Sequence, residues 1–99
     1  MANSSTESPA RPAADPAQIE DTILTLVAER GEGKTICPSE AARALGGSHP
    51  DGWGPLMIPV RRAAVRLAHA GRIVIYRKGK PVDPDDFKGV YRLGLPRLD

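Results

Sequence analysis

Hydrophobic residues recur at helical spacing in the second half of the chain, within the segment WGPLMIPVRRAAVRLAHAGRIVIYRKGK that spans residues 53–80. The spacing i, i+4, i+7, i+11 and i+14 predicts one buried helix face, formed by Leu56, Val60, Ala63, Leu67 and Ala70. Gly71 follows directly, where a left-handed cap favours glycine. Because Pro59 has no backbone donor, either a short turn over 55–58 precedes a helix that starts near Pro59, or the first turn is bent.

An earlier helix is predicted over residues 16–30. Asp15 is a suitable N-cap, Pro16 fits the first helical position, and Gly31 ends the helix. Its buried face is expected to contain Ile19, Ile23, Leu26 and Val27, whereas Leu24 lies off this face and is free to meet another element or a partner chain. The residues before it are rich in Ser, Pro and Ala without periodicity, which predicts a disordered tail over 1–15 and a single domain over 16–96.

The region between these helices predicts a small edge strand over 34–36 and a further helix over 38–45. Cys37 is expected to cap that helix, with Glu40 at the capping-box distance and with Ala41, Ala44 and Leu45 facing inward. Residues 46–54, GGSHPDGWG, predict a turn-rich connection. Trp53 within it is either an aromatic plug against the core or a platform on which a base stacks.

The C-terminal part predicts a β-hairpin. Residues 72–77, RIVIYR, have strong strand propensity, a turn begins at 78–80 and extends to 86, and a return strand is expected over 89–95. In that strand Tyr91, Leu93 and Leu95 alternate with Val90, Arg92 and Gly94. The order of elements predicts an α+β fold of the winged helix-turn-helix type, with three helices plus a C-terminal β-hairpin wing, and places the third helix in the recognition position.

Charge is distributed unevenly along the 99 residues, although the net charge is only +2. Residues 1–33 carry 6 of the 12 acidic residues and 2 of the 14 basic ones, so the rest of the chain is strongly basic. The segment 53–80 contains seven basic residues and no acidic residue, namely Arg61, Arg62, Arg66, Arg72, Arg77, Lys78 and Lys80. This pattern indicates a basic binding face or, alternatively, a solvated charged surface.

Several motifs resemble a known family. They are TICPSEAARALGG, then W-x-x-LM-x-x-VR-x-x-A-x-x-LA-x-x-GRI, then KGK-x-VDP and a closing GVYRL. Together they resemble a family of small uncharacterised bacterial proteins, described only as a domain of unknown function, some of which are grouped with winged-helix domains. The resemblance covers roughly residues 18–95, and its most specific segments are 37–40 and 71–80. It supports the fold and implies no activity.

The charge pattern and the element order favour a DNA-binding regulator or accessory protein. A helix of about 12–16 residues with a basic face fits the major groove. The residues expected to contact nucleic acid are Arg61, Arg62, Arg66 and His69 on the helix, with Lys78 and Lys80 on the wing. Alternatively, Arg61 and Arg72 pair with Glu40 or Asp83 and hold the fold together. The acidic residues of the wing would repel phosphate if they face the duplex.

The sequence leaves two further classes of function to weigh. One is a protein-interaction module without nucleic-acid binding, using Leu24, Ile58, Val65 and the hairpin edge, with homodimerisation through the first helix compatible with either function. The other is an enzyme, for which Cys37, His49 and His69 are the candidate groups. Since no CxxC, HExxH, GxGxxG or P-loop motif is present, we expect no enzyme, no cofactor and no metal site.

Two further expectations concern Cys37 and the cellular location. Cys37 is the only cysteine, so an intramolecular disulfide is ruled out and the thiol is either a structural cap or a redox switch. A zinc site would require Cys37, His49, Asp51 and His69 to converge. No apolar run approaches the length of a membrane helix and no signal peptide is recognisable, which predicts a cytoplasmic protein without membrane contact.

Overall fold

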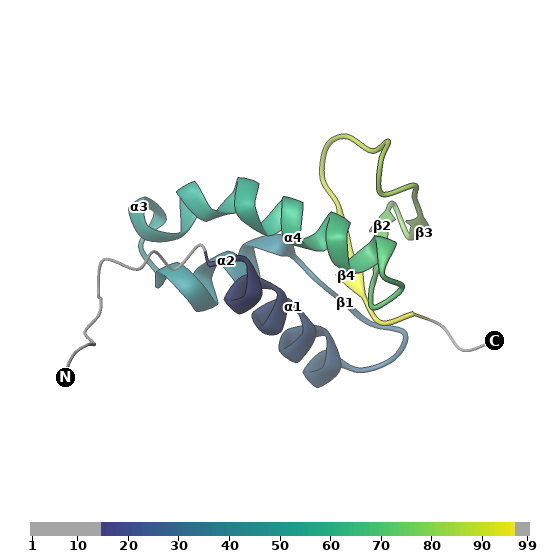
Figure 1. Cartoon of the computed structure of the whole chain (residues 1–99), viewed down its shortest axis with the longest axis horizontal. Coiled ribbons are helices and arrows are strands. Elements are labelled where there is room, and N and C mark those ends of the chain that lie inside the picture. Colours follow the sequence, from purple (N-terminus) through teal and green to yellow (C-terminus); the bar gives the residue numbers. More distant parts are fainter. Residues whose placement is uncertain (1–14, 97–99) are drawn as a thin grey trace.

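The computed structural model describes residues 15–96, so the predicted tail lies outside them except for Asp15. The elements in chain order are α1 (Pro16–Arg30), β1 (Thr35–Ile36), α2 (Pro38–Gly46), α3 (Pro50–Trp53), the 3-10 turn η2 (Gly54–Leu56), α4 (Met57–His69), β2 (Val74–Arg77), β3 (Lys80–Pro81) and β4 (Arg92–Gly94). In Figure 1, α4 runs along the upper edge of the molecule above α1, and the strands gather at the carboxyl end of α4. The fold is α+β, with an element order compatible with a winged helix-turn-helix.

Helix α1 has the predicted bounds because both of its ends are specified locally. The Asp15 carboxylate accepts a hydrogen bond of 3.1 Å from the Ala17 backbone nitrogen, and Gly31 ends the helix with a φ of +96°. The predicted buried positions Ile19, Ile23 and Val27 form the core face. Leu24 and Leu26 are both half-buried against the core. Leu24 therefore contributes to packing, so of the two predicted roles the contact with another element of the fold is the one that the structure has.

Helix α2 begins as predicted at Cys37 but packs on a different face. The Glu40 carboxylate Oε2 accepts a hydrogen bond of 2.9 Å from the Cys37 backbone nitrogen, which satisfies one of the free donors at the helix start. Ala41 and Ala42 are buried, whereas Ala44 is exposed, so the inward prediction for Ala44 is wrong. The helix packs on both α1 and α4, so its buried face includes Ala42 and not Ala44.

The connection over 46–54 is more regular than predicted. It contains the single-turn helix α3, in which His49 Nδ1 accepts a hydrogen bond of 3.1 Å from the Asp51 nitrogen. A Cβ added at Gly46 would lie 2.4 Å from the Gly52 carbonyl oxygen, so the two backbones meet only because glycine is present. Trp53 packs against the core, and the Arg43 guanidinium lies 4.9 Å from its ring centroid. Trp53 is thus the aromatic plug that the sequence suggested.

Helix α4 follows the 3-10 turn, so the first of the two predicted starts is correct, with Met57 as the first helical residue. Pro59 falls in the first turn, where a backbone N–H has no partner within the helix, and its missing donor costs little. The helix ends when Gly71 adopts a φ of +75°, and the Arg72 nitrogen donates to the Leu67 oxygen at 2.9 Å. Ala70 lies beyond this end and is exposed, contrary to the prediction.

The sheet is antiparallel, with the strand order β1-β4-β2-β3. Ile36, Leu93 and Ile75 are register partners across three strands and are at most 1% exposed, so they form its inner face against the helices. Strand β3 was not predicted. It pairs with β2 through a tight turn in which Lys78 and Gly79 have φ values of +52° and +82°, the geometry that a two-residue hairpin requires.

The return from β3 to β4 is longer and less regular than the sequence indicated. The predicted return strand over 89–95 is reduced to Arg92–Gly94, because Gly89 has a φ of +82° and Val90 is exposed to solvent. The segment 82–91 rises beside the carboxyl end of α4 in Figure 1. None of the helices in residues 15–96 is both long and apolar enough to cross a membrane.

Candidate nucleic-acid interface

Arg61, the first basic residue of α4, is half-buried and used inside the fold. Its guanidinium lies 3.8 Å from the ring centroid of Phe87 and 5.6 Å from that of Tyr91. The Nη2 atom donates a hydrogen bond of 2.7 Å to the Phe87 carbonyl oxygen. The structural alternative for Arg61 is therefore realised, but through Phe87 and not through Glu40 or Asp83. Arg61 fastens the segment 82–91 to α4.

Tyr91 completes this contact. Its ring meets that of Phe87 edge to face, with centroids 5.2 Å apart at 66°. Its hydroxyl is buried and has no hydrogen-bond partner among residues 15–96. Burial raises the pKa of Tyr91 to about 12, opposed by the positive charge of Arg61 and assisted by Cys37. A neutral hydroxyl is thus favoured at this position.

Arg66 and His69 lie on the outer side of α4, and each has an acidic partner. Arg66 Nε donates to Glu20 Oε2 on α1 at 2.6 Å, and His69 Nε2 lies 2.8 Å from Asp85 Oδ1. Because all four side chains are partly exposed, such pairs contribute little to stability and can exchange partners. The positive charge of Arg66 is nevertheless offset by Glu20 in the free protein.

Arg62 differs from its neighbours on α4. It is exposed and makes no ion pair or hydrogen bond with any residue in 15–96. It shares a shallow hollow along the outer face of α4 with Arg61, Arg66, Val65 and Ile58, whose side chain is 63% exposed. The middle of the helix therefore presents one unpaired guanidinium beside accessible aliphatic surface.

The hairpin also contains both a basic residue bonded within the fold and basic residues without a partner. Arg77 Nε donates to the Val90 carbonyl oxygen at 3.0 Å, so it holds the segment before β4 in place. Lys78 and Lys80 are exposed and have no partner within the described part of the chain. Their charge at the turn remains free to meet an anionic partner.

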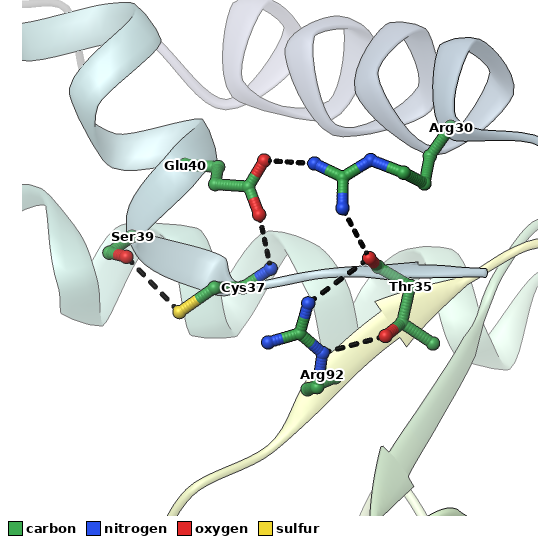
Figure 2. A network of polar contacts seen from close by, with 6 residues as sticks. All are labelled: Arg30, Thr35, Cys37, Ser39, Glu40 and Arg92. Atoms are coloured by element: carbon green, nitrogen blue, oxygen red, sulfur yellow. Dashed lines mark hydrogen bonds and ion pairs between the residues drawn. The ribbon is translucent and has the colours of Figure 1, made fainter.

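Six residues form a polar network around β1, shown in Figure 2, of which the sequence predicted the capping contact between Cys37 and Glu40. Arg30 donates to the Thr35 carbonyl oxygen at 2.9 Å and to Glu40 Oε1 at 2.5 Å. Arg92 donates to the same carbonyl oxygen at 3.1 Å and to Thr35 Oγ1 at 2.6 Å. The two arginines thereby tie the two-residue strand β1 to α1, α2 and β4. The positions of Arg30 and Glu40 at helix ends were visible in the sequence, but their meeting was not.

Of the groups considered for catalysis or metal binding, His49 and Asp51 are neighbours, with 3.7 Å between His49 Nδ1 and Asp51 Oδ2. Within residues 15–96, no three His, Cys, Asp or Glu side chains gather in a way that could hold a metal ion, so the zinc set of Cys37, His49, Asp51 and His69 does not converge. Cys37 is half-buried, and its Sγ lies 3.1 Å from Ser39 Oγ (Figure 2). His49 serves as the cap of α3. This arrangement offers no nucleophile and base in contact.

Comparison with protein-family models matches residues 16–96 to a family described as "Protein of unknown function (DUF3253)". This agrees with the resemblance seen in the sequence motifs and covers nearly the same residues. No curated protein sequence matches the chain.

Proposed function

The chain belongs to the family of proteins of unknown function DUF3253, and we propose that it binds duplex DNA as a regulator or accessory protein. One observation supports this proposal above the others. Arg62 on α4 and the lysines Lys78 and Lys80 at the hairpin turn are exposed, and none has an acidic partner within residues 15–96. These two elements are the ones that a winged helix presents to a duplex. In the bacterial source that the motif resemblance implies, such a protein would act in the cytoplasm.

The dimensions and chemistry of α4 suit this role. Its 13 residues span about 20 Å at 1.5 Å per residue, enough to lie in the major groove. Arg62 would contact phosphates or a guanine edge from the middle of the helix. The exposed Ile58 beside it offers apolar contact to a thymine methyl group.

The proposed interface contains fewer residues than the sequence predicted, because some of the predicted residues have partners within the fold. We leave Arg61 out of the proposed interface, because its guanidinium already donates to the Phe87 carbonyl oxygen and contacts the Phe87 ring. Arg66 joins the interface when it exchanges Glu20 for a phosphate, since a surface ion pair is worth only about 0–1 kcal/mol. His69 contributes least, because Asp85 stands beside it.

The test is fluorescence anisotropy of a labelled random-sequence duplex, titrated with the protein at several salt concentrations. We expect binding that weakens steeply with salt. Replacing one phosphate-contacting cation lowers the slope of log affinity against log salt by about 0.9. Arg62→Gln, Lys78→Asn and Lys80→Gln should each have this effect, whereas Arg62→Lys, which keeps the charge, should leave the slope unchanged. Absence of binding at low salt, or equal slopes for Arg62→Gln and the parent protein, would overturn the proposal.

A protein-binding role for the same face is the alternative, and it rests on the exposure of Ile58. Leu24 no longer supports it, since this side chain packs against the core. A protein that fails to bind the duplex, yet sediments as a dimer that Ile58→Ser converts to a monomer, would favour this alternative.

A further inference from the structure

A cavity of about 170 Å³ opens on the outer face of the sheet, away from the helices. It lies between the residues that lead into β1 and the turn of the β2–β3 hairpin, and its walls include Lys34, Thr35, Tyr76, Lys78, Arg92 and Leu95. This volume is below the roughly 300–1,000 Å³ of sites for drug-sized ligands. The cavity therefore suits a small molecule or one chemical group of a larger one.

The register of the sheet brings two lining residues of the cavity, Thr35 and Tyr76, together on the outer face. Gly94 pairs with both Thr35 and Val74, so a position without a side chain lies in the middle of the outer face. A Cβ added there would lie 3.2 Å from Tyr76 Cε2 and 3.3 Å from Thr35 Cγ2. The Lys34 carbonyl oxygen is nearer still, at 3.0 Å. The tyrosine ring and the threonine thus cover Gly94, and their other sides line the cavity.

The charge around this cavity is positive and uncompensated. Lys34 and Lys78 are exposed and make no ion pair with any residue in the described part of the chain. Arg92 donates two hydrogen bonds to Thr35 but has no carboxylate partner within residues 15–96. No aspartate or glutamate belongs to the lining. Three cations around one hollow repel one another, and an anion placed among them would relieve that repulsion.

We propose that this cavity binds a phosphate group carried on a small organic body. Lys34, Lys78 and Arg92 would hold the phosphate oxygens, and the ring of Tyr76 with Leu95 would contact the organic part. Arginine and lysine are the side chains that bind phosphate most strongly, through charge-assisted hydrogen bonds. The site lies on a different surface from the outer face of α4 and shares only Lys78 with the proposed DNA interface.

The same phosphate chemistry has two sources, a free phosphate ester or the backbone of a nucleic acid, and the experiment separates them. The backbone amides of the full chain are followed by NMR while phenyl phosphate, and in a second series a short DNA duplex, is added. Phenol serves as the uncharged control for the organic part. We expect saturable shifts at Lys34, Tyr76, Arg92 and Leu95 with phenyl phosphate and none with phenol. Shifts at these residues with the duplex alone would support the phosphate site and assign it to nucleic acid.

Two variants test whether the named cations bind the phosphate. Lys78→Asn removes the charge but suits the positive φ of +52°, since asparagine is favoured at this position of a hairpin turn. Lys34→Gln removes a charge from an exposed side chain. Each should weaken phenyl phosphate binding about five- to tenfold, the loss of one charge-assisted contact. Lys88→Gln removes an equal charge outside the cavity lining and should leave the affinity unchanged.

The proposal is overturned if neither phenyl phosphate nor the duplex shifts the cavity residues. It is equally overturned if Lys88→Gln weakens phenyl phosphate binding as much as Lys78→Asn does, because the binding would then reflect overall charge. Either result leaves the duplex proposal to be judged by Arg62, which does not line the cavity.

Discussion

The basic residues of this protein fall into two regions that use positive charge differently. Around β1 and the segment 82–91, arginines are bound to backbone carbonyl oxygens, as Arg30 and Arg92 are to Thr35 and Arg61 is to Phe87. On the outer face of α4 and at the hairpin turn, Arg62, Lys78 and Lys80 have no partner within residues 15–96. The bound arginines serve segments with few ladder hydrogen bonds, where the forked guanidinium supplies the missing donors. A segment rich in basic residues therefore does not always form a positively charged surface, because some of its arginines are bonded within the fold.

The strongest test of this contrast compares two adjacent residues of α4. Arg61→Ala removes a half-buried guanidinium with its hydrogen bond and its contacts to two rings. We expect it to lower the free energy of unfolding by about 2–4 kcal/mol. Arg62→Ala should change it by less than about 0.5 kcal/mol. Urea denaturation of both variants measures the difference, and similar losses would show that the division of the two arginines is wrong.

The network around β1 should give the next largest effect. Glu40→Ala removes both the acceptor for the Cys37 N–H and the partner of Arg30. Because this pair is partly exposed, we expect a loss of about 1–2 kcal/mol. Glu40→Gln keeps an acceptor for the helix start, so it should lose about half as much. Thermal or urea unfolding separates the two contributions, and equal losses would mean that the cap contributes little.

Tyr91→Phe removes the buried hydroxyl of a ring that lies near the Arg61 guanidinium, and it should stabilise the protein. The buried hydroxyl has no partner within residues 15–96, so its removal should add about 1 kcal/mol near neutral pH. The folded-state pKa of about 12 exceeds the usual value near 10, so below pH 10 the hydroxyl is neutral in both states and ionisation does not affect stability. As the pH rises from 10 toward 12, the unfolded chain loses this proton first, and the free energy of unfolding of the parent protein falls. The advantage of Tyr91→Phe, measured by urea unfolding at each pH, should therefore grow between pH 10 and 12, and a constant difference would contradict the assignment.

Arg66 is intermediate between the bonded arginines and the unpaired cations, because it has a partner, Glu20, but the ion pair is partly exposed to solvent. Glu20→Gln should cost less than about 1 kcal/mol of stability while releasing the guanidinium for phosphate. We expect affinity for the duplex at low salt to rise about two- to fivefold, an increment typical of one exposed charge. Asp21→Gln, which removes an exposed carboxylate from the next position of α1, is the matched control. An equal gain for both variants would indicate a general charge effect.

Local signals in the sequence were sufficient for much of the fold. The bounds of α1, the cap at Cys37 and the glycine at Gly71 that prevents α4 from continuing follow from residues adjacent in the chain. The missed strand β3 has only two residues, too few to show alternation. The exposure of Ala44 depends on how α2 packs against two other helices, which a helical pattern of small residues does not specify.

The candidate site was harder to predict, because side chains far apart in sequence decide which charges stay free. Arg61 meets Phe87 across 26 positions, and Arg66 meets Glu20 across 46. The sequence predicted a basic face on α4 but did not distinguish Arg61, which is bonded within the fold, from Arg62, which is exposed. The cavity lined by Thr35, Tyr76 and Arg92 was also missed, since it depends on the register of three strands.

The most direct test of the central claim is NMR mapping of the duplex-binding surface on the full chain. We expect that amide shifts during a DNA titration concentrate around Arg62 on α4 and around Lys78 and Lys80 at the hairpin. Residues of α1 that face away, such as Glu29, should change little. Shifts centred on Arg30 and Glu40, or no shifts at low salt, would contradict the claim that the unpaired cations form the nucleic-acid interface.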